Sequence, residues 1–282
     1  ALLEDTGISG GYVTISSGGK GKNIKITDGT FQIKAGAAVE NLSITSSANI
    51  DLTLNDKTIL AGNVSGRAFQ TKNGVLENYT NLTNCLLKLE NKGKASGTIV
   101  EKDGHIYISS GAQAFNTVVK ENGDLTVYSG GLAKGGSCYG ETYIYGGTLQ
   151  DMTIQTGAYA HISSGAQAID TVVKGNGVLT VYSGGLAKGG SCYGHAYIKG
   201  GSLQDTTFLS GAYAYISSGA QAFNTVVREN GVLTVYSGGL AKGGSCYGHA
   251  DIKGGTLQDM TIQTGAYIHI SSGALLEDTG IS

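Results

Sequence analysis

The segment YISSGAQAFNTVVKENGDLTVYSGGLAKGGSCYG, residues 107–140, decides the fold because it recurs almost unchanged twice further along the chain. The second copy begins at His161 and the third at Tyr215, so each repeated unit is 54 residues long and follows the last without a gap. A fixed period of this length is typical of a solenoid, in which each unit stacks only on its neighbours. The sequence therefore predicts an array of stacked units.

Each unit divides into three shorter segments, because Ser-Gly and Gly-Gly corners recur inside it. Alignment on these glycines places one apolar residue of each segment in a single column, with steps of 19, 16 and 19 residues between its first four members. An uncharged column is what the inward face of stacked strands requires. The predicted core ladder consists of Val119, Cys138, Ile154, Val173, Cys192, Phe208, Val227, Cys246 and Ile262.

Apolar and polar residues alternate along short runs between Gly-rich corners, as expected for strands with one buried face. Successive rungs run in the same direction, and parallel crossovers are strongly right-handed. We therefore expect an all-β right-handed parallel β-helix, a β-solenoid of about fifteen rungs with roughly 16–19 residues in each. A left-handed coil with rungs of similar length is the alternative.

The predicted organisation has four parts. Residues 1–48 read as solenoid rungs, and residues 107–268 are the three tandem repeats, each of three rungs. Residues 49–106 lack the Ser-Gly-Gly corners but keep the alternation of apolar and polar residues, which indicates divergent rungs with irregular loops. Cys85 precedes Ile108 at nearly the spacing that separates the cysteine and isoleucine of a regular copy, which indicates a degenerate repeat. Residues 269–282 begin the next rungs.

The peptide ALLEDTGIS occurs both as residues 1–9 and as residues 274–282, with starting points 273 residues apart. This overlap predicts that 273 residues form a higher-order repeat of a longer protein; a boundary chosen when the segment was cut is the alternative. We expect further copies of the module as end-to-end partners, either as tandem 273-residue repeats or as a head-to-tail polymer.

The composition excludes several classes of protein. With 19 basic and 21 acidic side chains the formal net charge is −2, and neither sign forms a run, so nucleic acid is not an expected partner. The sequence has no apolar stretch of about 18 residues, so no membrane insertion is expected in this segment. Glycine supplies 47 residues without a Gly-x-y period, which excludes collagen.

The strings SSGAQAFNTVV, GVLTVYSGG and GGTLQDMTI resemble the AIDA-type repeat of autotransporter adhesin passenger regions and related bacterial surface proteins. The string GLAKGGSCYG departs from that pattern by placing Gly136 and Cys138 where Thr and Val are usual. The resemblance implies an extracellular β-helical stalk with an adhesive or self-associating surface, often decorated by O-linked heptoses. By this resemblance, the outward Thr126, Ser129 and Thr180 are candidate acceptors.

Aromatic residues recur at outward positions. The predicted surface aromatic column consists of Tyr107, His161, Tyr215 and His269, and a second set consists of Tyr128, Tyr182 and Tyr236. Such ladders stabilise a sheet by stacking on their neighbours, which needs no ligand. A long array of Tyr, Ser and Thr could also bind host or matrix glycans, or another copy of itself, through many weak identical sites.

The sequence offers no metal, cofactor or catalytic site that we expect to be real. Cys192 and His195 have the spacing of half a zinc site, but no second pair lies within a rung. Some enzymatic β-helices cleave acidic polysaccharides with clustered aspartates and a basic residue. The only irregular stretch with such residues contains Asp51, Asp56, Lys57 and Arg67. Solvated loop charges explain these residues equally well.

The repeated cysteines lie one unit apart, so three strand spacings of about 4.8 Å separate them by about 14 Å. A disulfide needs Cα atoms within roughly 7 Å, which excludes bridges between them. Outward thiols could crosslink neighbouring filaments, whereas inward thiols would act as small core hydrophobes. Their place in the apolar column favours buried, reduced and unreactive thiols.

We therefore interpret the chain as a structural, rod-like repeat module of a bacterial cell-surface or extracellular filamentous protein, serving adhesion or self-association. A glycan-binding module is the first alternative. A polysaccharide-degrading β-helix enzyme is the second, and the scattered acidic residues argue against it.

Overall fold

The computed structural model describes residues 1–281, which form strands and turns with no helix among them. The chain divides into two compact units, of which the first covers residues 1–141 and the second begins at Thr142. Together the units contain about 15 rungs of stacked parallel strands. The predicted all-β solenoid is confirmed, and the handedness of the coil stays a prediction.

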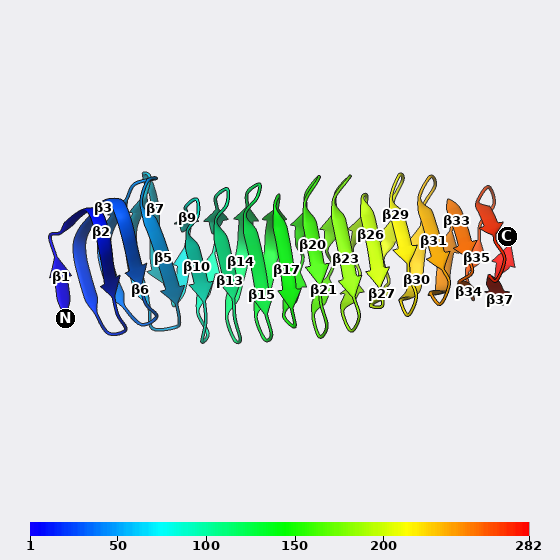
Figure 1. Cartoon of the computed structure of the whole chain (residues 1–282), viewed down its shortest axis with the longest axis horizontal. Coiled ribbons are helices and arrows are strands. Elements are labelled where there is room, and N and C mark those ends of the chain that lie inside the picture. The colour runs from blue at the N-terminus through cyan, green and yellow to red at the C-terminus, as the bar shows by residue number, and fades with distance from the viewer. Residues whose placement is uncertain (282) are drawn as a thin grey trace. The chain divides into compact units, whose positions relative to one another are not determined.

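The first unit holds the strands from the N-terminus to Cys138 (Figure 1). They are β1 (Leu2–Glu4), β2 (Gly7–Ile15), β3 (Lys20–Ile33), β4 (Ala38–Ile44), β5 (Asn49–Leu54), β6 (Ile59–Val64), β7 (Arg67–Lys72), β8 (Val75–Glu77), β9 (Thr80–Asn81), β10 (Leu86–Leu89), β11 (Lys94–Ser96), β12 (Ile99–Val100), β13 (His105–Ile108), β14 (Gln113–Val119), β15 (Asp124–Tyr128) and β16 (Leu132–Cys138).

Strand β17 (Glu141–Tyr145) starts at the last residue of the first unit, and all later strands belong to the second. They are β18 (Thr148–Gln150), β19 (Thr153–Ile154), β20 (Tyr159–Ile162), β21 (Gln167–Ile169), β22 (Val172–Val173), β23 (Val178–Tyr182), β24 (Leu186–Lys188), β25 (Ser191–Cys192), β26 (His195–Lys199), β27 (Ser202–Gln204), β28 (Thr207–Phe208), β29 (Tyr213–Ile216), β30 (Gln221–Val227), β31 (Val232–Tyr236), β32 (Leu240–Cys246), β33 (His249–Lys253), β34 (Thr256–Gln258), β35 (Thr261–Ile262), β36 (Tyr267–Ile270), β37 (Leu275–Glu277) and β38 (Gly280–Ile281).

A regular rung of the second unit contains three strands, as in the succession β20, β21 and β22. Each of them pairs in parallel with its equivalent one rung later, namely β23, β24 and β25. A sharp bend separates the second strand from the third, and its residue has a positive φ, as in Asp170 (φ 49°) and Asn224 (φ 51°). Asn and Asp tolerate this left-handed conformation better than other side chains, so one such residue or a glycine marks the bend.

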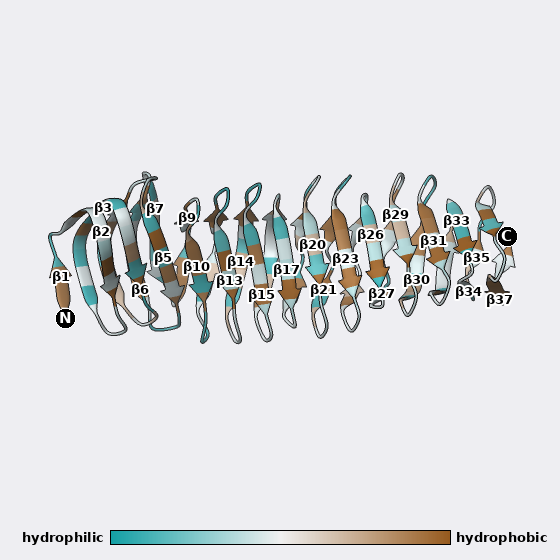
Figure 2. Cartoon of the chain, in the orientation of Figure 1, coloured by the Kyte–Doolittle hydropathy of each residue, from teal (hydrophilic) through white to brown (hydrophobic). Residues whose placement is uncertain are grey.

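Side chains alternate between the interior of the coil and its surface, which appears as alternating brown and teal bands along the strands of Figure 2. The strand register places Val173 next to Cys192, then Cys192 next to Phe208, and Phe208 next to Val227. Each of these four residues is at most 2% exposed. All nine residues of the core ladder are buried.

The divergent region of the first unit contains an antiparallel insertion. Strand β6 pairs in parallel with β4, β7 runs antiparallel between β6 and β8, and β8 returns to parallel pairing with β11. Two tight turns make this possible, Ser65-Gly66 and Asn73-Gly74, and all four of their residues have positive φ. Two-residue turns of this conformation match the twist of hairpin strands.

On the neighbouring sheet of the same unit, β5 pairs directly with β10. The sheet with the insertion therefore has two additional strands, β7 and β8, between β6 and β11, whereas β5 and β10 are direct neighbours. The core ladder continues through this region as Asn81, Val100 and Val119. Cys85 lies outside it, beside Gly104 at the start of the next strand. The alignment of Cys85 with the repeated cysteines is therefore wrong.

Asn81 is a fully buried polar residue in an otherwise apolar column. Its amide nitrogen donates hydrogen bonds to the carbonyl oxygens of Cys85 and His105, at 2.8 and 2.9 Å. These bonds tie two successive turns of the coil together at one corner. Within residues 1–281 there is no helix long and apolar enough to cross a membrane.

Candidate binding surface on one sheet

One outer surface of the second unit is dominated by aromatic side chains. It is formed by β20, β23, β26, β29, β31, β33 and β36, which pair in sequence, together with the outward residues of β17. We call it the aromatic face. Its aromatic residues are Tyr143, Tyr145, Tyr159, His161, Tyr182, His195, Tyr197, Tyr213, Tyr215, Tyr236, His249, Tyr267 and His269.

Local sequence explains why these rings point outward. In YAYI of β29 and HAYI within β26, alanine and isoleucine occupy the inward positions and are fully buried. Because side chains alternate across a strand, the aromatic residues between them must face solvent. The aromatic face is thus a consequence of the same alternation that builds the core.

Four rings at the centre of the aromatic face form a stacked cluster. Between rungs, the ring centroids of His195 and Tyr213 lie 5.2 Å apart, and those of Tyr197 and Tyr215 lie 4.9 Å apart. Along each strand, His195 lies 6.3 Å from Tyr197, and Tyr213 lies 6.2 Å from Tyr215. The ring planes in these four pairs deviate from parallel by 15° or less.

This geometry determines which parts of the rings a partner can reach. The rings stack along the direction in which rungs succeed one another, so their faces largely cover each other. Ring edges and phenol hydroxyl groups point outward instead. Such pairs contribute about 0.5–1.5 kcal/mol each beyond the area they bury. The cluster therefore stabilises the sheet and also presents a row of hydrogen-bonding groups.

The same pattern begins earlier on the aromatic face. His161 stacks on Tyr143 at 5.2 Å and on Tyr182 at 6.2 Å, and it lies 6.4 Å from Tyr159 on its own strand. Further along, His249 and Tyr267 approach to 5.6 Å with their planes tilted by 52°. The stack is thus best ordered between β26 and β29.

Lysine ammonium groups lie over the tyrosine rings at one edge of the aromatic face. Lys199 Nζ is 5.8 Å from the ring centre of Tyr197 and 6.0 Å from that of Tyr182. Lys253 Nζ is 6.0 Å from the ring centre of Tyr236, one repeat later. Exposed cation–π contacts of this kind contribute about 0.5–1 kcal/mol. The edge is therefore both aromatic and positively charged.

Partial burial raises the pKa of the Tyr215 hydroxyl, and the neighbouring phenols Tyr197, Tyr236 and Tyr213 raise it further. Tyr215 therefore stays protonated at neutral pH, where a phenol both donates and accepts hydrogen bonds. A neutral ring also stacks on Tyr197 without charge repulsion.

The members of the predicted column Tyr107, His161, Tyr215 and His269 all point outward, but three rungs separate each from the next. Between His161 and Tyr215 the same column holds Thr180 and Tyr197. In the first unit, Tyr107 meets Tyr128 edge to face, with ring centroids 6.0 Å apart. Sequence analysis missed Tyr159, Tyr197 and Tyr213, although the Tyr-Ala-Tyr and His-Ala-Tyr alternation carries the signal.

The expectation that Thr126 and Thr180 are accessible acceptors for sugars is wrong. Both residues occupy outward-facing positions of their strands, but their side chains are only 5% and 4% exposed. The strand register puts Thr126 beside Tyr107, and Thr180 between His161 and Tyr197, so much larger neighbours cover these short side chains. Ser129, at the following corner, is exposed.

The acidic and basic residues that the sequence singles out in the irregular region lie on different elements. Asp51 accepts a hydrogen bond from Gln32 Nε2 at 3.2 Å, and Asp56 lies in the turn after β5. Arg67 lies on β7, where its Nη2 donates a hydrogen bond to the carbonyl oxygen of Gly97 at 3.1 Å. Within residues 1–281 no group of three or more His, Cys, Asp or Glu side chains could hold a metal ion.

Cys192 and His195, which have the spacing of half a zinc site, lie on opposite sides of the strand layer. Cys192 is buried inside, while His195 stands on the aromatic face. Burial raises the pKa of the Cys192 thiol to about 12. All four cysteines are buried, and none forms a disulfide in the described chain.

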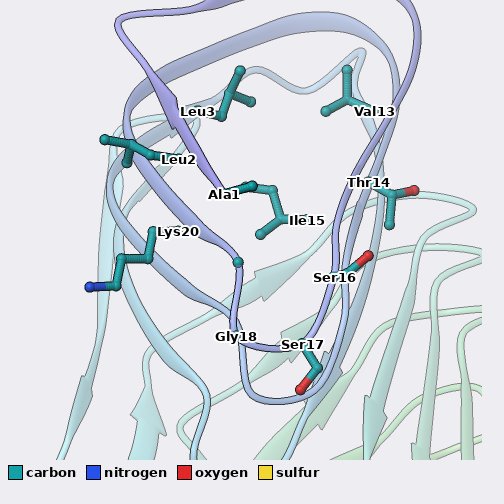
Figure 3. Close-up of a pocket in the computed structure, with 11 residues that line it drawn as sticks. Ala1, Leu2, Leu3, Val13, Thr14, Ile15, Ser16, Ser17, Gly18 and Lys20 are labelled. Atoms are coloured by element: carbon teal, nitrogen blue, oxygen red, sulfur yellow. The ribbon is translucent and has the colours of Figure 1, made fainter.

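A hollow of about 390 Å³ opens at the first rung, lined by residues that include Leu3, Val13 and Ile15. Figure 3 shows these three side chains around the inside of the coil. The strand register continues their positions as Gly21, Phe31 and Ile33, which are interior residues of the next rung. The hollow is therefore the inner surface of a rung, and its lining residues continue the hydrophobic core.

The chain is similar to a known adhesin. It is 28% identical over 143 residues to the autotransporter adhesin/invasin TibA of Escherichia coli O78:H11 (strain H10407 / ETEC). The match covers 49% of this chain and 14% of the adhesin, so the chain corresponds to a small part of its relative's length. No family model matches the chain.

A solved structure of a hyper-glycosylated TibA fragment, whose glycosylation was catalysed by TibC, has the same fold. The TM-score is 0.61 at 24% sequence identity, over 98% of this chain and 99% of the fragment. The resemblance to the β-solenoids of autotransporter adhesin passenger regions is thereby confirmed. These similarities support an adhesin-type surface repeat module.

Proposed function

We propose that this chain is a structural repeat module of a bacterial cell-surface or extracellular protein, and that it serves adhesion or self-association through its aromatic face. The stacked cluster of His195, Tyr197, Tyr213 and Tyr215 is the observation that carries the proposal. Tyrosine supplies large, rigid contact area at low entropic cost, which is why binding surfaces are enriched in it.

The regular scaffold supports the same proposal. Each 54-residue repeat presents the aromatic face again three rungs later, about 14 Å along the stack. Several weak and similar contacts acting together bind far more strongly than one of them. Host or matrix glycans and further copies of the module are the partners that we propose, with tandem 273-residue repeats or end-to-end association of chains as the arrangement of those copies.

We propose that exposed serines at the rung corners carry O-linked sugars. The TibA fragment of similar fold is hyper-glycosylated by TibC. Ser129 and its equivalents Ser183 and Ser237 are exposed corner residues that follow the aromatic positions of their strands. Mass spectrometry of protein produced together with a matching transferase tests this; peptides that remain unmodified at all three serines would remove the idea.

Surface display tests the proposed function. The chain is displayed on a non-adherent bacterium, and adherence to epithelial cells and sedimentation of the culture are measured. We expect Tyr159→Thr, Tyr213→Thr and Tyr267→Thr together to reduce both, because these three rings of the aromatic face are exposed to solvent. The matched control replaces Gln167, Gln204 and Gln221, on the neighbouring sheet, by Thr.

Equal adherence and sedimentation of the two variants, at equal display levels, would contradict the role of the aromatic face. Wild-type adherence that persists after glycans are stripped from the epithelial cells would argue against glycan partners. Loss of sedimentation alone identifies a second copy as the partner.

A further inference from the structure

Two tyrosines of the stacked cluster lie on facing positions of adjacent rungs. The strand register pairs Tyr197 of β26 directly with Tyr215 of β29. Their ring centroids are 4.9 Å apart, and the ring planes differ by 9°. The equivalent pairs, one repeat length earlier and later, are Tyr143 with His161 and Asp251 with His269. Tyr197, in the second repeat, and Tyr215, the first residue of the third, are therefore the pair in which both members are phenols.

This pair has the geometry for oxidative coupling. Both side chains are half-buried, so solvent reaches their outer edges while the backbone holds their Cβ atoms on neighbouring strands. Each is attached through two rotatable bonds, χ1 and χ2, that let the rings slip from a stacked to an edge-to-edge arrangement. Holding two reactants together in this way raises their effective concentration by orders of magnitude.

We propose that Tyr197 and Tyr215 form a dityrosine bond, which staples two adjacent rungs when the protein meets hydrogen peroxide and a haem peroxidase. Each phenol loses one electron and one proton to give a phenoxyl radical. The radicals join through the ring carbons ortho to oxygen, and the two hydrogens on those carbons move to the oxygens. Hydrogen peroxide takes up the two electrons and two protons and becomes two molecules of water.

The cysteines explain why this route matters for the fold. Cys138, Cys192 and Cys246 are buried inside the coil and stand three rungs apart, so they cannot form bridges between rungs. Tyrosines on the outer face are reachable and lie on adjacent rungs. The stacked phenols thus offer this chain a covalent crosslink that its thiols do not.

The test treats purified, folded protein with a haem peroxidase and hydrogen peroxide, as a mixture of isotopically light and heavy protein. We expect a dityrosine-linked peptide pair containing Tyr197 and Tyr215, less two hydrogen atoms, with both peptides light or both heavy. The linked pair should vanish in Tyr197→Phe and in Tyr215→Phe. It should persist in Tyr267→Phe, the matched control on the same face.

Protein unfolded in urea provides the second control, because unfolding removes the facing geometry but leaves every tyrosine present. The linked peptide should then fall to the level of other tyrosine pairs. Two results would overturn the proposal: coupling of Tyr197 and Tyr215 only between light and heavy chains, or coupling in folded protein no more frequent than in urea. Because the readout is a covalent product, it is independent of the adhesion that we propose above.

Discussion

The substitution Gly190→Ala tests why the GLAKGGSCYG segment departs from the pattern of its neighbours. Gly190 has φ +78°, a conformation that L-amino acids other than Asn and Asp rarely adopt. A Cβ atom built there would overlap the carbonyl oxygen of Thr171 on the preceding rung and lie 2.8 Å from its backbone nitrogen. Gly136 and Gly244 are in the same position in the other two repeats and meet Thr117 and Thr225 in the same way.

The magnitude follows from two separate costs. Left-handed backbone strain in a residue with a Cβ costs roughly 1–2 kcal/mol. Relief of the clash with backbone of the adjacent rung requires a shift of well-packed structure, at about 1–3 kcal/mol. Gly190→Ala should therefore lower the free energy of unfolding by about 2–5 kcal/mol.

Gly175→Ala is the matched control. Nothing lies within 4 Å of a Cβ at Gly175, and its φ is not positive. The equivalent residues in the other repeats are Glu121 and Glu229, so a side chain fits there. We expect no loss of stability, and a gain of up to about 1 kcal/mol from reduced freedom of the unfolded chain.

Urea unfolding followed by far-UV circular dichroism measures both variants, since the chain has no tryptophan. The account requires a clearly lower midpoint for Gly190→Ala than for wild type. Unfolding free energies of the two variants within about 0.5 kcal/mol of each other, the range of ordinary surface substitutions, would refute the close contact at Gly190.

Three further predictions concern the interior. Phe208→Ala should lower the free energy of unfolding by about 3–5 kcal/mol, because a fully buried ring is removed, whereas Phe223→Ala on the outer side should cost less; urea unfolding compares them. Because burial raises the pKa of the Cys192 thiol to about 12, a polar thiol reagent should label it at pH 8 only as fast as the protein unfolds, and rapid labelling of folded protein would show that it is outside the core. Burial, aided by Cys85 and Asp51, also raises the pKa of Tyr79 above its usual value. An unfolded tyrosine ionises near pH 10, so the stability that Tyr79 contributes is complete below that pH and is lost as pH rises further; Tyr79→Phe should flatten the alkaline fall in unfolding midpoint, and an unchanged profile would contradict it.

The repeats made the regular part of the fold predictable. Alignment on glycines found the column that contains Val173, Cys192 and Phe208 because the corners recur at fixed positions and each rung has one strictly inward residue there. The same reasoning placed the aromatic residues outside. It could not show that rings on adjacent rungs stack at 4.9 Å, since that depends on side-chain conformation.

The antiparallel strand β7 was missed although its signal is present. Ser65-Gly66 and Asn73-Gly74 flank an alternating segment, which is the pattern of two successive hairpins. The sequence was interpreted here as divergent parallel rungs with irregular loops, because the parallel repeat dominates the chain. The burial of Thr126 and Thr180 was missed for a different reason. Alternation along a strand determines whether a side chain faces the interior or the surface, but the size of its neighbours on adjacent rungs determines how exposed it is.

Competition by soluble protein tests the central claim most directly, namely that the aromatic face binds the partner while the remaining surfaces serve as scaffold. Purified chain is added to cells that display the same chain, and their adherence and sedimentation are measured. The account predicts that wild-type protein and the Gln167, Gln204 and Gln221 variant inhibit both processes equally. It predicts no inhibition by folded protein in which Tyr159, Tyr213 and Tyr267 are replaced by Thr. Equal inhibition by this last variant would contradict the claim.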